Sequence, residues 1–242
     1  TMSRYHALRV RAVVDETHDT KSLVFEVPPA LASAFAYQPG QFLTLRLPID
    51  GRHVPRCYSL SSAPGVDDAL RVTVKRVKDG RGSNWVCDRI RTGDTVEVLA
   101  PSGVFYPRSL DGDFLLLAGG SGITPVFSIL RTVLAKAQGR ATLLYANRDE
   151  KSVIFQSELK ALAEAHPARL TVIHWLETVQ GLPNTDALAT LVGPFAAHEA
   201  FICGPGPFMS AAEAALKTVD ARHIHIEVFK SLDSDPFAQV VI

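Results

Sequence analysis

The sequence predicts a two-domain protein, in which an antiparallel β-barrel with one short helix precedes an α/β domain with a parallel sheet. From Tyr5 to about Val104, apolar residues alternate in short runs bounded by Gly, Pro, Asp or Asn, as in antiparallel strands. Beyond about Asp111, continuous apolar runs alternate with amphipathic segments, as in βα units. A chain of 242 residues is long enough to bury two such cores.

The first domain is expected to contain roughly six strands and one helix. Five strand candidates are "ALRVRAVVDET", "SLVFEV", "QFLTLRLP", "RVTVKRV" and "TVEVLAP", and "RCYSLSS" lies on a further strand. The helix is expected over residues 83–90, because Ser83 offers N-cap chemistry and apolar residues follow at helical spacing before "RTGD" turns the chain back.

The second domain is expected to alternate strands with helices. Its strand candidates are "FLLLAGG", "ATLLYAN", "LTVIHWLE" and "AFICGPG", and its helix candidates are "TPVFSILRTVLAKAQG", "FQSELKALAEAHP", "TDALATLVG" and "PFMSAAEAALKTV". This alternation predicts a parallel sheet with right-handed crossovers. We therefore expect residues 1–110 to form the barrel, residues 111–230 the α/β domain and residues 231–242 a linker.

The composition narrows the classes of partner. Lys and Arg together number 25, as do Asp and Glu, so neither a nucleic acid nor an anionic membrane is expected as a partner. No apolar run approaches the ~20 residues that span a bilayer, and the charged start is unlike a signal peptide. The three cysteines lie far apart without a C-x-x-C pair, so we expect no disulfide framework, zinc site or iron–sulfur cluster within this chain. A cytoplasmic protein is expected.

A glycine cluster at the start of the second domain marks a candidate phosphate site. "DFLLLAGGSGITP" places Gly119, Gly120 and Gly122 between a buried strand and a helix whose first turn holds Thr124 and Pro125, with the proline expected at the N1 position. Glycines let backbone N–H groups approach a pyrophosphate, and the helix N-terminus adds positive potential. Thr124 and Pro125 stand where a Rossmann fingerprint has its last glycine. A tight turn without a ligand is the alternative.

A second signal ends another buried strand of this domain. "FICGPGPFM" places Cys203, Gly204 and Pro205 at the carboxyl edge of the predicted sheet, where open α/β folds bind ligands. Taken alone, Cys203 is better explained as a small buried apolar residue.

The segment "HVPRCYSLSS" carries residues suited to a flavin dinucleotide. The planar guanidinium of Arg56 suits a diphosphate, the ring of Tyr58 suits a flat heteroaromatic system, and the hydroxyl of Ser59 suits a ring nitrogen. A strand-end arginine and a half-buried tyrosine are the structural alternative.

Four motifs in order favour the functional interpretation. "RCYSLSS", "VTVKRVKDGRGSNW", "GGSGITP" and "CGPGPFM", followed by "IEVF", resemble the ferredoxin-NADP reductase superfamily over nearly the whole chain. Within it, the chain looks most like the reductase components of bacterial oxygenases. "LLYANRDEKSVIF", "HWLE", "QGLP" and "HIHIEVFKSLDSDPFA" look like the 3-ketosteroid 9α-hydroxylase branch.

The resemblance implies roles for residues of the barrel. Arg56 would contact the FAD pyrophosphate, Tyr58 would pack against the isoalloxazine, and Ser59 would lie near flavin N5. Other positions on the strands and in the short helix would complete the FAD site, and these are Cys57, Val74, Lys75, Gly82, Ser83 and Asn84.

The resemblance also implies a nicotinamide site. Thr124 and Cys203 would bracket the nicotinamide, and Glu227 and Phe229 would lie beside the flavin ring. Ser59, Cys203 and Glu227 are the residues expected at the reacting atoms. The remaining dinucleotide contacts are expected at Gly120, Ser121, Gly122, Ile123, Arg148, Gly204 and Pro205.

The choice of dinucleotide depends on the end of "TLLYAN". Arg148 could hold a 2'-phosphate, whereas the acidic Asp149 and Glu150 favour the free ribose hydroxyls of NADH. We expect NADH, with NADPH as the alternative and a solvated loop charge as the structural explanation of Arg148.

The resemblance implies an electron-transfer function. NADH would reduce FAD by hydride transfer, and single electrons would pass through a 2Fe-2S centre to a terminal oxygenase of the Rieske type. Reductases of this branch carry the cluster in a C-terminal domain with C-x4-C-x2-C spacing, which this sequence lacks, so we expect a truncated two-domain module. The alternatives are a stand-alone ferredoxin or flavodoxin-NADP reductase and a non-catalytic FAD-binding regulatory subunit.

A metal site is the competing chemistry. His223, His225 and Glu227 alternate along "HIHIEVF" and would share one face of a strand, opposite a core face of Ile224, Ile226 and Val228. We expect polar residues without a metal. The histidines have no recognisable nucleophile partner for hydrolase chemistry.

Overall fold

The computed structural model describes residues 4–229, which divide into two compact units between Tyr106 and Pro107. The linker expected over residues 231–242 lies outside the described residues. None of the helices in the described part is long and apolar enough to cross a membrane.

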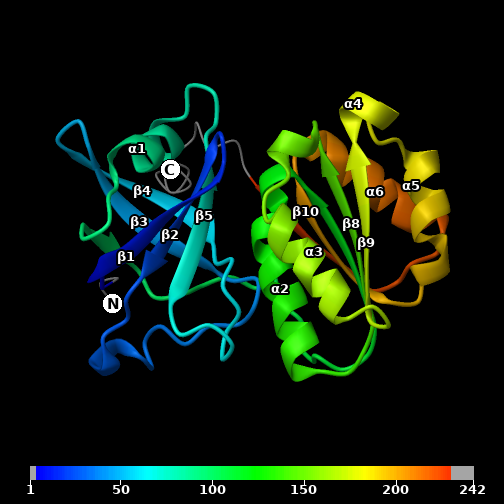
Figure 1. The fold of residues 1–242 in the computed structure, drawn as a ribbon, viewed down its shortest axis with the longest axis horizontal. Helices are drawn as coiled ribbons and strands as arrows, with labels where there is room; N and C mark the ends of the chain where they lie inside the picture. Colours follow the sequence, from blue (N-terminus) through cyan, green and yellow to red (C-terminus); the bar gives the residue numbers. More distant parts are fainter. Residues whose placement is uncertain (1–3, 230–242) are drawn as a thin grey trace, which may run out of the picture. The chain divides into compact units, whose positions relative to one another are not determined.

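The first unit is a six-stranded antiparallel sheet (Figure 1). Its strand order is β4-β3-β6-β1-β2-β5, and an isolated bridge between Leu60 and Val72 joins the segment after β4 to β5. The sheet therefore closes on itself, as the alternating apolar pattern predicts. The bounds are β1 (His6–Thr17), β2 (Thr20–Phe25), β3 (Phe42–Ile49), β4 (Arg52–Ser59), β5 (Leu70–Lys75) and β6 (Thr95–Val98), with a 3-10 turn η1 (Pro29–Leu31).

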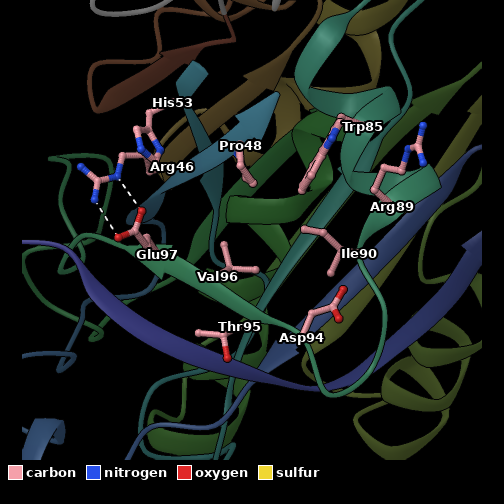
Figure 2. A pocket seen from close by; sticks show the side chains of 10 residues that line it. All are labelled: Arg46, Pro48, His53, Trp85, Arg89, Ile90, Asp94, Thr95, Val96 and Glu97. Atoms are coloured by element: carbon pink, nitrogen blue, oxygen red, sulfur yellow. Dashed lines mark hydrogen bonds and ion pairs between the residues drawn. The ribbon is translucent and has the colours of Figure 1, made fainter. Parts of the chain in front are cut away.

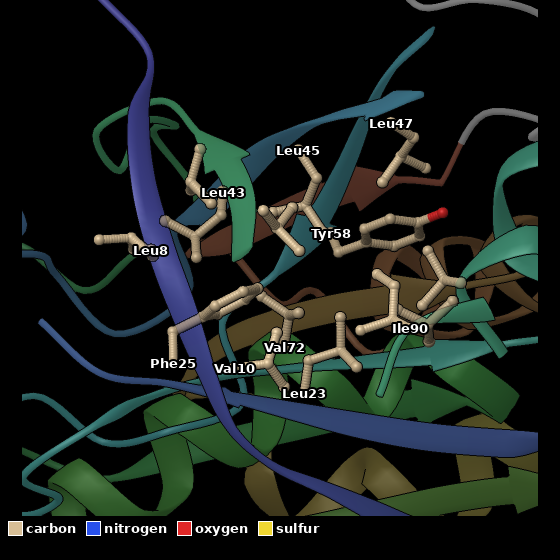
Figure 3. Close-up of a cluster of buried hydrophobic side chains, with 14 of the residues drawn as sticks. Leu8, Val10, Leu23, Phe25, Leu43, Leu45, Leu47, Tyr58, Val72 and Ile90 are labelled. Carbon is tan, nitrogen blue, oxygen red and sulfur yellow. The ribbon is translucent and has the colours of Figure 1, made fainter. Parts of the chain in front are cut away.

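The register of β3 and β4 shows which of their residues point into the barrel. Tyr58 lies opposite Leu43 and Arg56 opposite Leu45 in the antiparallel register, so these side chains share the inner face. Figure 3 shows Tyr58 and Leu45 within the buried cluster, with the phenol oxygen at one end of that cluster.

The single helix of this unit, α1 (Arg81–Arg89), begins earlier than the sequence predicts. Its N-cap is Gly80, which offers no side-chain cap, and Ser83 lies inside the first turn. The prediction of an N-cap at Ser83 is therefore wrong. The hydroxyl of Ser83 instead accepts a hydrogen bond from the backbone N–H of Val77 at 3.0 Å and so fastens the helix to the preceding loop.

The second unit is a five-stranded parallel sheet of order β11-β10-β7-β8-β9. In Figure 1, α2 and α3 cover one face of this sheet and α5 and α6 the other. Together the units confirm the predicted fold class. The strand bounds are β7 (Phe114–Gly119), β8 (Ala141–Asn147), β9 (Leu170–Leu176), β10 (Glu199–Gly204) and β11 (Ile224–Val228). The α-helices are α2 (Ile123–Lys136), α3 (Gln156–Ala165), α4 (Glu177–Gln180), α5 (Thr185–Val192) and α6 (Gly206–Thr218), and the 3-10 turns are η2 (Gly120–Gly122), η3 (Glu150–Ser152) and η4 (Gly193–Phe195).

The start of α2 differs from the expected one. The 3-10 turn η2 leads directly into the helix, so Gly122 is the N-cap and Pro125 is the third helical residue rather than N1. Proline is tolerated there because the first four N–H groups of a helix have no partner within the helix.

The outermost strand, β11, does not have the expected core face. Ile224 packs against the apolar cluster beneath α6, but Ile226 is 38% exposed and Val228 is 61% exposed. Alternation along a strand assigns residues to two faces. The alternation does not reveal how much of an edge strand is covered by other elements, and β11 is covered only along part of its length.

Candidate functional site

A buried arginine lies at the centre of the predicted FAD site. Arg56 is 4% exposed, and its Nη1 donates to the carbonyl of the adjacent Pro55 at 2.9 Å. Its Nε has no hydrogen-bond partner, and no carboxylate of the described residues pairs with it. Burying an unpaired charge is costly, so this guanidinium suits an anionic ligand.

The first turn of α1 lies against this arginine. A Cβ added to Gly82 would be 2.7 Å from Cγ of Arg56, so any larger residue would have to displace the arginine side chain. The positive end of the helix dipole and the guanidinium are thereby brought together. Two sources of positive potential at one place are what a pyrophosphate needs.

Ser83 and Asn84 are turned toward the preceding loop. The amide nitrogen of Asn84 donates to the carbonyls of Val77 and Gly80 at 2.9 and 2.7 Å, and its Oδ1 accepts from Arg76 at 3.2 Å. These side chains therefore hold the loop before α1, and the helix offers a ligand only the backbone N–H groups of its first residues, which have no partner within the helix.

Tyr58 and Ser59 are both buried at the end of β4. The Tyr58 hydroxyl has no hydrogen-bond partner among the described residues, and burial raises the pKa of this phenol well above its usual range. On β5, Val74 is buried and Lys75 is half-buried, and Cys57 is half-buried on β4.

These observations test whether the unit fits FAD. Two neighbouring inward-facing residues of one strand, Arg56 and Tyr58, each carry a buried polar atom without a partner. Native proteins rarely leave such atoms unsatisfied. An anionic diphosphate and a polar chain attached to it would supply both missing partners, so the residues present fit FAD.

The first unit also contains a pocket of about 430 Å³ that lies elsewhere (Figure 2). It lies between the later half of α1, including Trp85 and Arg89, and residues of β3 and β6. One wall carries the ion pair of Arg46 with Glu97, in which two nitrogens and two oxygens meet at 2.7 Å. None of the residues assigned to FAD lines this pocket, so we do not assign the cofactor to it.

In the second unit, the two glycine turns meet. A Cβ added to Gly122 would overlap the carbonyl of Cys203, and one added to Gly204 would lie 3.0 Å from the backbone nitrogen of Gly119. The turn between β7 and α2 is therefore pressed against the end of β10. This is the carboxyl edge of the sheet, where ligands bind in open α/β folds.

The other residues of this turn are held by the backbone conformation and by local contacts. Gly120 has a φ of 51°, a left-handed conformation that glycine adopts without strain. The Thr124 hydroxyl donates to the carbonyl of Ser121 at 3.1 Å, and Thr124 and Ile123 are buried. Thr124 thus closes the turn with its own side chain, and the turn can offer an anionic ligand only backbone N–H groups of η2. Pro205 is the exposed N-cap of α6.

The structure brings Cys203 and Glu227 together, as opposite residues of the parallel strands β10 and β11. Burial, and secondarily the charge of Glu227, raises the pKa of the Cys203 thiol well above its ordinary value. The thiol is therefore neutral and suited to packing and weak hydrogen bonding rather than to nucleophilic chemistry. Phe229 follows β11 and is half-buried.

Arg148 lies at the same edge, directly after β8, with its side chain exposed. Of the two neighbouring acids, Asp149 accepts hydrogen bonds from the backbone N–H and the hydroxyl of Ser152 at 3.0 and 2.8 Å. Glu150 is exposed and accepts from Gln156 at 3.2 Å.

Asn147 is a residue that the sequence analysis missed. It ends β8, is 4% exposed, and neither amide atom has a hydrogen bond of good geometry within the described residues. The amide lies near enough to the Tyr145 hydroxyl to offset part of the rise that burial causes in the pKa of that group. The available signal was a polar residue closing the otherwise apolar run "ATLLYA", directly before Arg148.

The competing metal site is not assembled. His225 hydrogen-bonds Glu199 at 2.9 Å and stacks on Phe201 with ring centroids 4.5 Å apart. Residues 4–229 contain no group of three His, Cys, Asp or Glu side chains placed to share a metal ion.

Comparisons with known proteins match the two units to two kinds of oxidoreductase domain. Residues 7–106 match the oxidoreductase FAD-binding domain, and residues 116–214 match the oxidoreductase NAD-binding domain. The ferredoxin reductase component of a 3-ketosteroid-9-alpha-monooxygenase from Rhodococcus rhodochrous is 61% identical over 239 residues, which are 98% of this chain and 68% of that protein. The reductase of a glycine betaine monooxygenase from Chromohalobacter salexigens is 33% identical, covering 97% of this chain and 67% of that protein.

Solved structures show the same architecture. The FAD/NAD-binding domain of a nitric oxide dioxygenase from Vibrio cholerae superposes with a TM-score of 0.81 at 28% identity, covering 94% of this chain and 99% of that one. A cytochrome P450 reductase from Amycolatopsis superposes with a TM-score of 0.77 at 26% identity, covering 96% of this chain and 72% of that one.

Proposed function

This chain belongs to the FAD- and NAD-binding oxidoreductases that include the ferredoxin reductase components of 3-ketosteroid 9α-monooxygenases, and we propose that it transfers a hydride from NADH to FAD for such an oxygenase system. Bound FAD would supply the step that joins two-electron to one-electron chemistry, because a flavin accepts a hydride and releases electrons singly. A 2Fe-2S centre would take up those electrons.

The single observation that supports this proposal is the buried Arg56, which lacks an anionic partner and lies against Gly82 of α1. A purely structural arginine in a barrel would be paired or exposed. We propose that Arg56 and the backbone N–H groups of the first turn, at Gly82 and Ser83, bind the pyrophosphate, and that the Asn84 side chain holds the loop beside them. Tyr58 would orient the flavin, Ser59 would hydrogen-bond it, and backbone groups of Cys57, Val74 and Lys75 would complete the site.

For NADH, we propose that the backbone of Gly120–Ile123 binds the pyrophosphate and that Arg148 lies at the adenosine end. Cys203 and Thr124 would orient the nicotinamide, with Glu227 and Phe229 in the roles that the family resemblance implies. The neutral thiol of Cys203 excludes water without competing as a nucleophile. The adjoining backbone at Gly204 and Pro205 would border the same ligand.

We further propose that residues 1–110 form the FAD-binding domain and residues 111–230 the NAD-binding domain. The electron acceptor would be a terminal oxygenase of the Rieske type that hydroxylates a 3-ketosteroid, or a ferredoxin that serves it. The names of the relatives support a monooxygenase system. Two buried thiols, Cys87 and Cys203, suit the reducing conditions of the cytoplasm, where we propose that the protein acts.

The test is anaerobic reduction of the FAD-loaded chain. We expect the yellow flavin absorbance to bleach within seconds when NADH is added, and more slowly with NADPH. A plant-type cluster is held by about four cysteine thiolates, whereas this chain has three cysteines. Electron delivery should therefore require an added 2Fe-2S protein. Reduction of a one-electron dye by NADH should proceed without it.

Two results would count against the proposal. A preparation that binds FAD but stays oxidised in NADH would be a regulatory FAD-binding subunit. A well-folded preparation that retains no FAD after reconstitution would contradict the flavin assignment itself.

A further inference from the structure

A single tyrosine hydroxyl holds the loop that follows β8. Tyr145 is fully buried in the middle of β8, and its hydroxyl accepts a hydrogen bond from the backbone N–H of Ile154 at 3.0 Å. The same hydroxyl donates to the carbonyl of Ile154 at 3.2 Å. Both backbone groups of one residue are thereby bound by one side chain, and Ile154 itself is fully buried.

The next residue is held in an unfavourable conformation. Phe155 has φ and ψ of 64° and 26°, the left-handed region that residues with a Cβ seldom adopt. It is the N-cap of α3, and its ring stacks on Phe127 of α2 with centroids 4.3 Å apart and planes 18° apart. Strained backbone persists only where the surroundings determine it. Here the Tyr145 hydroxyl and the Phe127 ring do so.

The other end of the loop is also fixed. The carbonyl of Arg148 accepts a hydrogen bond from the backbone N–H of Thr178 at 3.0 Å. Asp149 is the N-cap of η3 and accepts a hydrogen bond from the Ser152 hydroxyl. The segment between residues 148 and 155 is therefore attached at both ends. One end carries Arg148 at the carboxyl edge of the sheet, and the other end is stacked on the helix that begins at the glycine turn.

We infer that Tyr145 is a positioning residue for NADH binding, which acts by fixing the loop that carries Arg148 relative to the start of α2. This inference rests on the proposed function, since it assigns Arg148 and the glycine turn to two parts of one nucleotide. The hydroxyl touches neither the nucleotide nor the reacting atoms. It sets the distance between Arg148 and the glycine turn, the two groups assigned to the nucleotide.

The test compares Tyr145→Phe with wild type in rapid-mixing reduction by NADH. The variant keeps the ring and removes only the hydroxyl, which leaves the Ile154 N–H buried without a partner. We expect the NADH dissociation constant, taken from the concentration dependence of the reduction rate, to rise by up to about tenfold, because the loss of one hydrogen bond to a buried group limits how strongly the loop can favour a released position. The limiting reduction rate and the FAD content should stay within roughly twofold.

A matched control separates positioning from general destabilisation. Thr132, a buried residue of α2, donates its hydroxyl to the carbonyl of Ser128 in the same helix at 2.7 Å. Thr132→Val removes a buried hydroxyl from the same unit without leaving a backbone group unpaired, and the NADH dissociation constant should not change. Phe127→Leu removes the stacking partner from the other side and should weaken NADH binding as Tyr145→Phe does, which keeps the test open if the tyrosine variant folds poorly.

Hydrogen exchange supplies a readout besides activity. In Tyr145→Phe, protection of the Ile154 and Leu159 amides should fall while that of β7 stays, because the N–H of Leu159 bonds to the carbonyl of Phe155. An unchanged NADH dissociation constant in Tyr145→Phe overturns the inference, whether or not protection falls. A wild-type protein that NADH fails to reduce contradicts the proposed function instead.

Discussion

The side chain of Arg56 and the backbone of Gly82 lie so close that a Cβ at Gly82 would come within 2.7 Å of Cγ of the arginine. A buried cation and a helix N-terminus repel each other electrostatically, so the apoprotein holds an unfavourable arrangement that an anion would relieve.

Arg56→Met should therefore have opposite effects on the two forms of the protein. Without FAD, the variant should be no less stable than wild type in denaturant unfolding, because a buried charge without a partner is removed. FAD affinity should fall roughly 10- to 100-fold, the equivalent of about 1.5–3 kcal/mol for a charge-assisted hydrogen bond. Titration of the apoprotein with FAD measures this. Arg46→Gln, which breaks the half-buried pair with Glu97 away from the predicted FAD residues, is the control and should leave FAD affinity intact.

Gly122→Ala should remove nucleotide binding and spare the flavin. The added methyl group would overlap the carbonyl of Cys203, so the turn before α2 must separate from the end of β10. Overpacking of this kind costs about 1–3 kcal/mol, and the phosphate-binding backbone would move with the turn. We expect full FAD content, a lower unfolding temperature and little bleaching by NADH. Gly206→Ala is the matched control, because no atom lies within 4 Å of the Cβ position there and Gly206 opens α6. Equal bleaching by both variants would contradict the assignment of the turn.

The buried thiol of Cys203 should make the protein less stable at alkaline pH. Its pKa is raised by burial, so between the ordinary thiol pKa of about 8.5 and the folded-state value the unfolded chain loses a proton that the folded chain keeps. The unfolded state then binds fewer protons, and stability falls with rising pH by up to about 1.4 kcal/mol per pH unit. Below that range the thiol is protonated in both states and contributes nothing.

Cys203→Ala should accordingly reduce the slope of stability against pH between about 8.5 and 10, before tyrosines titrate in the unfolded chain. Cys87, whose pKa burial also raises, remains in the variant, so the slope should decrease without vanishing. Urea unfolding midpoints of both proteins at several pH values give the slopes. Identical slopes would show that the Cys203 thiol titrates normally in the folded protein.

The sequence predicted the layers of the fold because period-two and βα patterns are local properties of the chain. It also located the glycine turns, since glycines between a buried strand and a helix are typical of a tight turn. It did not predict that the Ser83 and Asn84 side chains bond the loop before α1 or that the Thr124 hydroxyl bonds Ser121, because a short polar side chain has several backbone partners within reach.

Two further features depend on tertiary packing. The left-handed conformation of Phe155 carries no glycine or asparagine signal, because it is imposed by the ring of Phe127 and the hydroxyl of Tyr145. The exposure of Val228 follows from its place on the edge strand β11, and strand order is not a property of any single segment.

The choice between NADH and NADPH should depend on Arg148. Asp149, which could repel a 2'-phosphate, already accepts two hydrogen bonds from Ser152, whereas Arg148 is exposed at the same edge of the sheet. The wild-type protein should prefer NADH, with measurable activity toward NADPH that depends on this guanidinium. Arg148→Ala should lower kcat/KM for NADH by up to about tenfold, since the guanidinium is assigned to the adenosine end of either nucleotide. It should lower the value for NADPH roughly tenfold further, since a charge-assisted hydrogen bond to phosphate is worth about 1.5–3 kcal/mol. Arg140→Ala is the matched control, because Arg140 is an exposed arginine just before the opposite end of β8, and neither value should change. If Arg148→Ala lost activity equally with both nucleotides, the guanidinium would instead be assigned to the pyrophosphate, which the two nucleotides share.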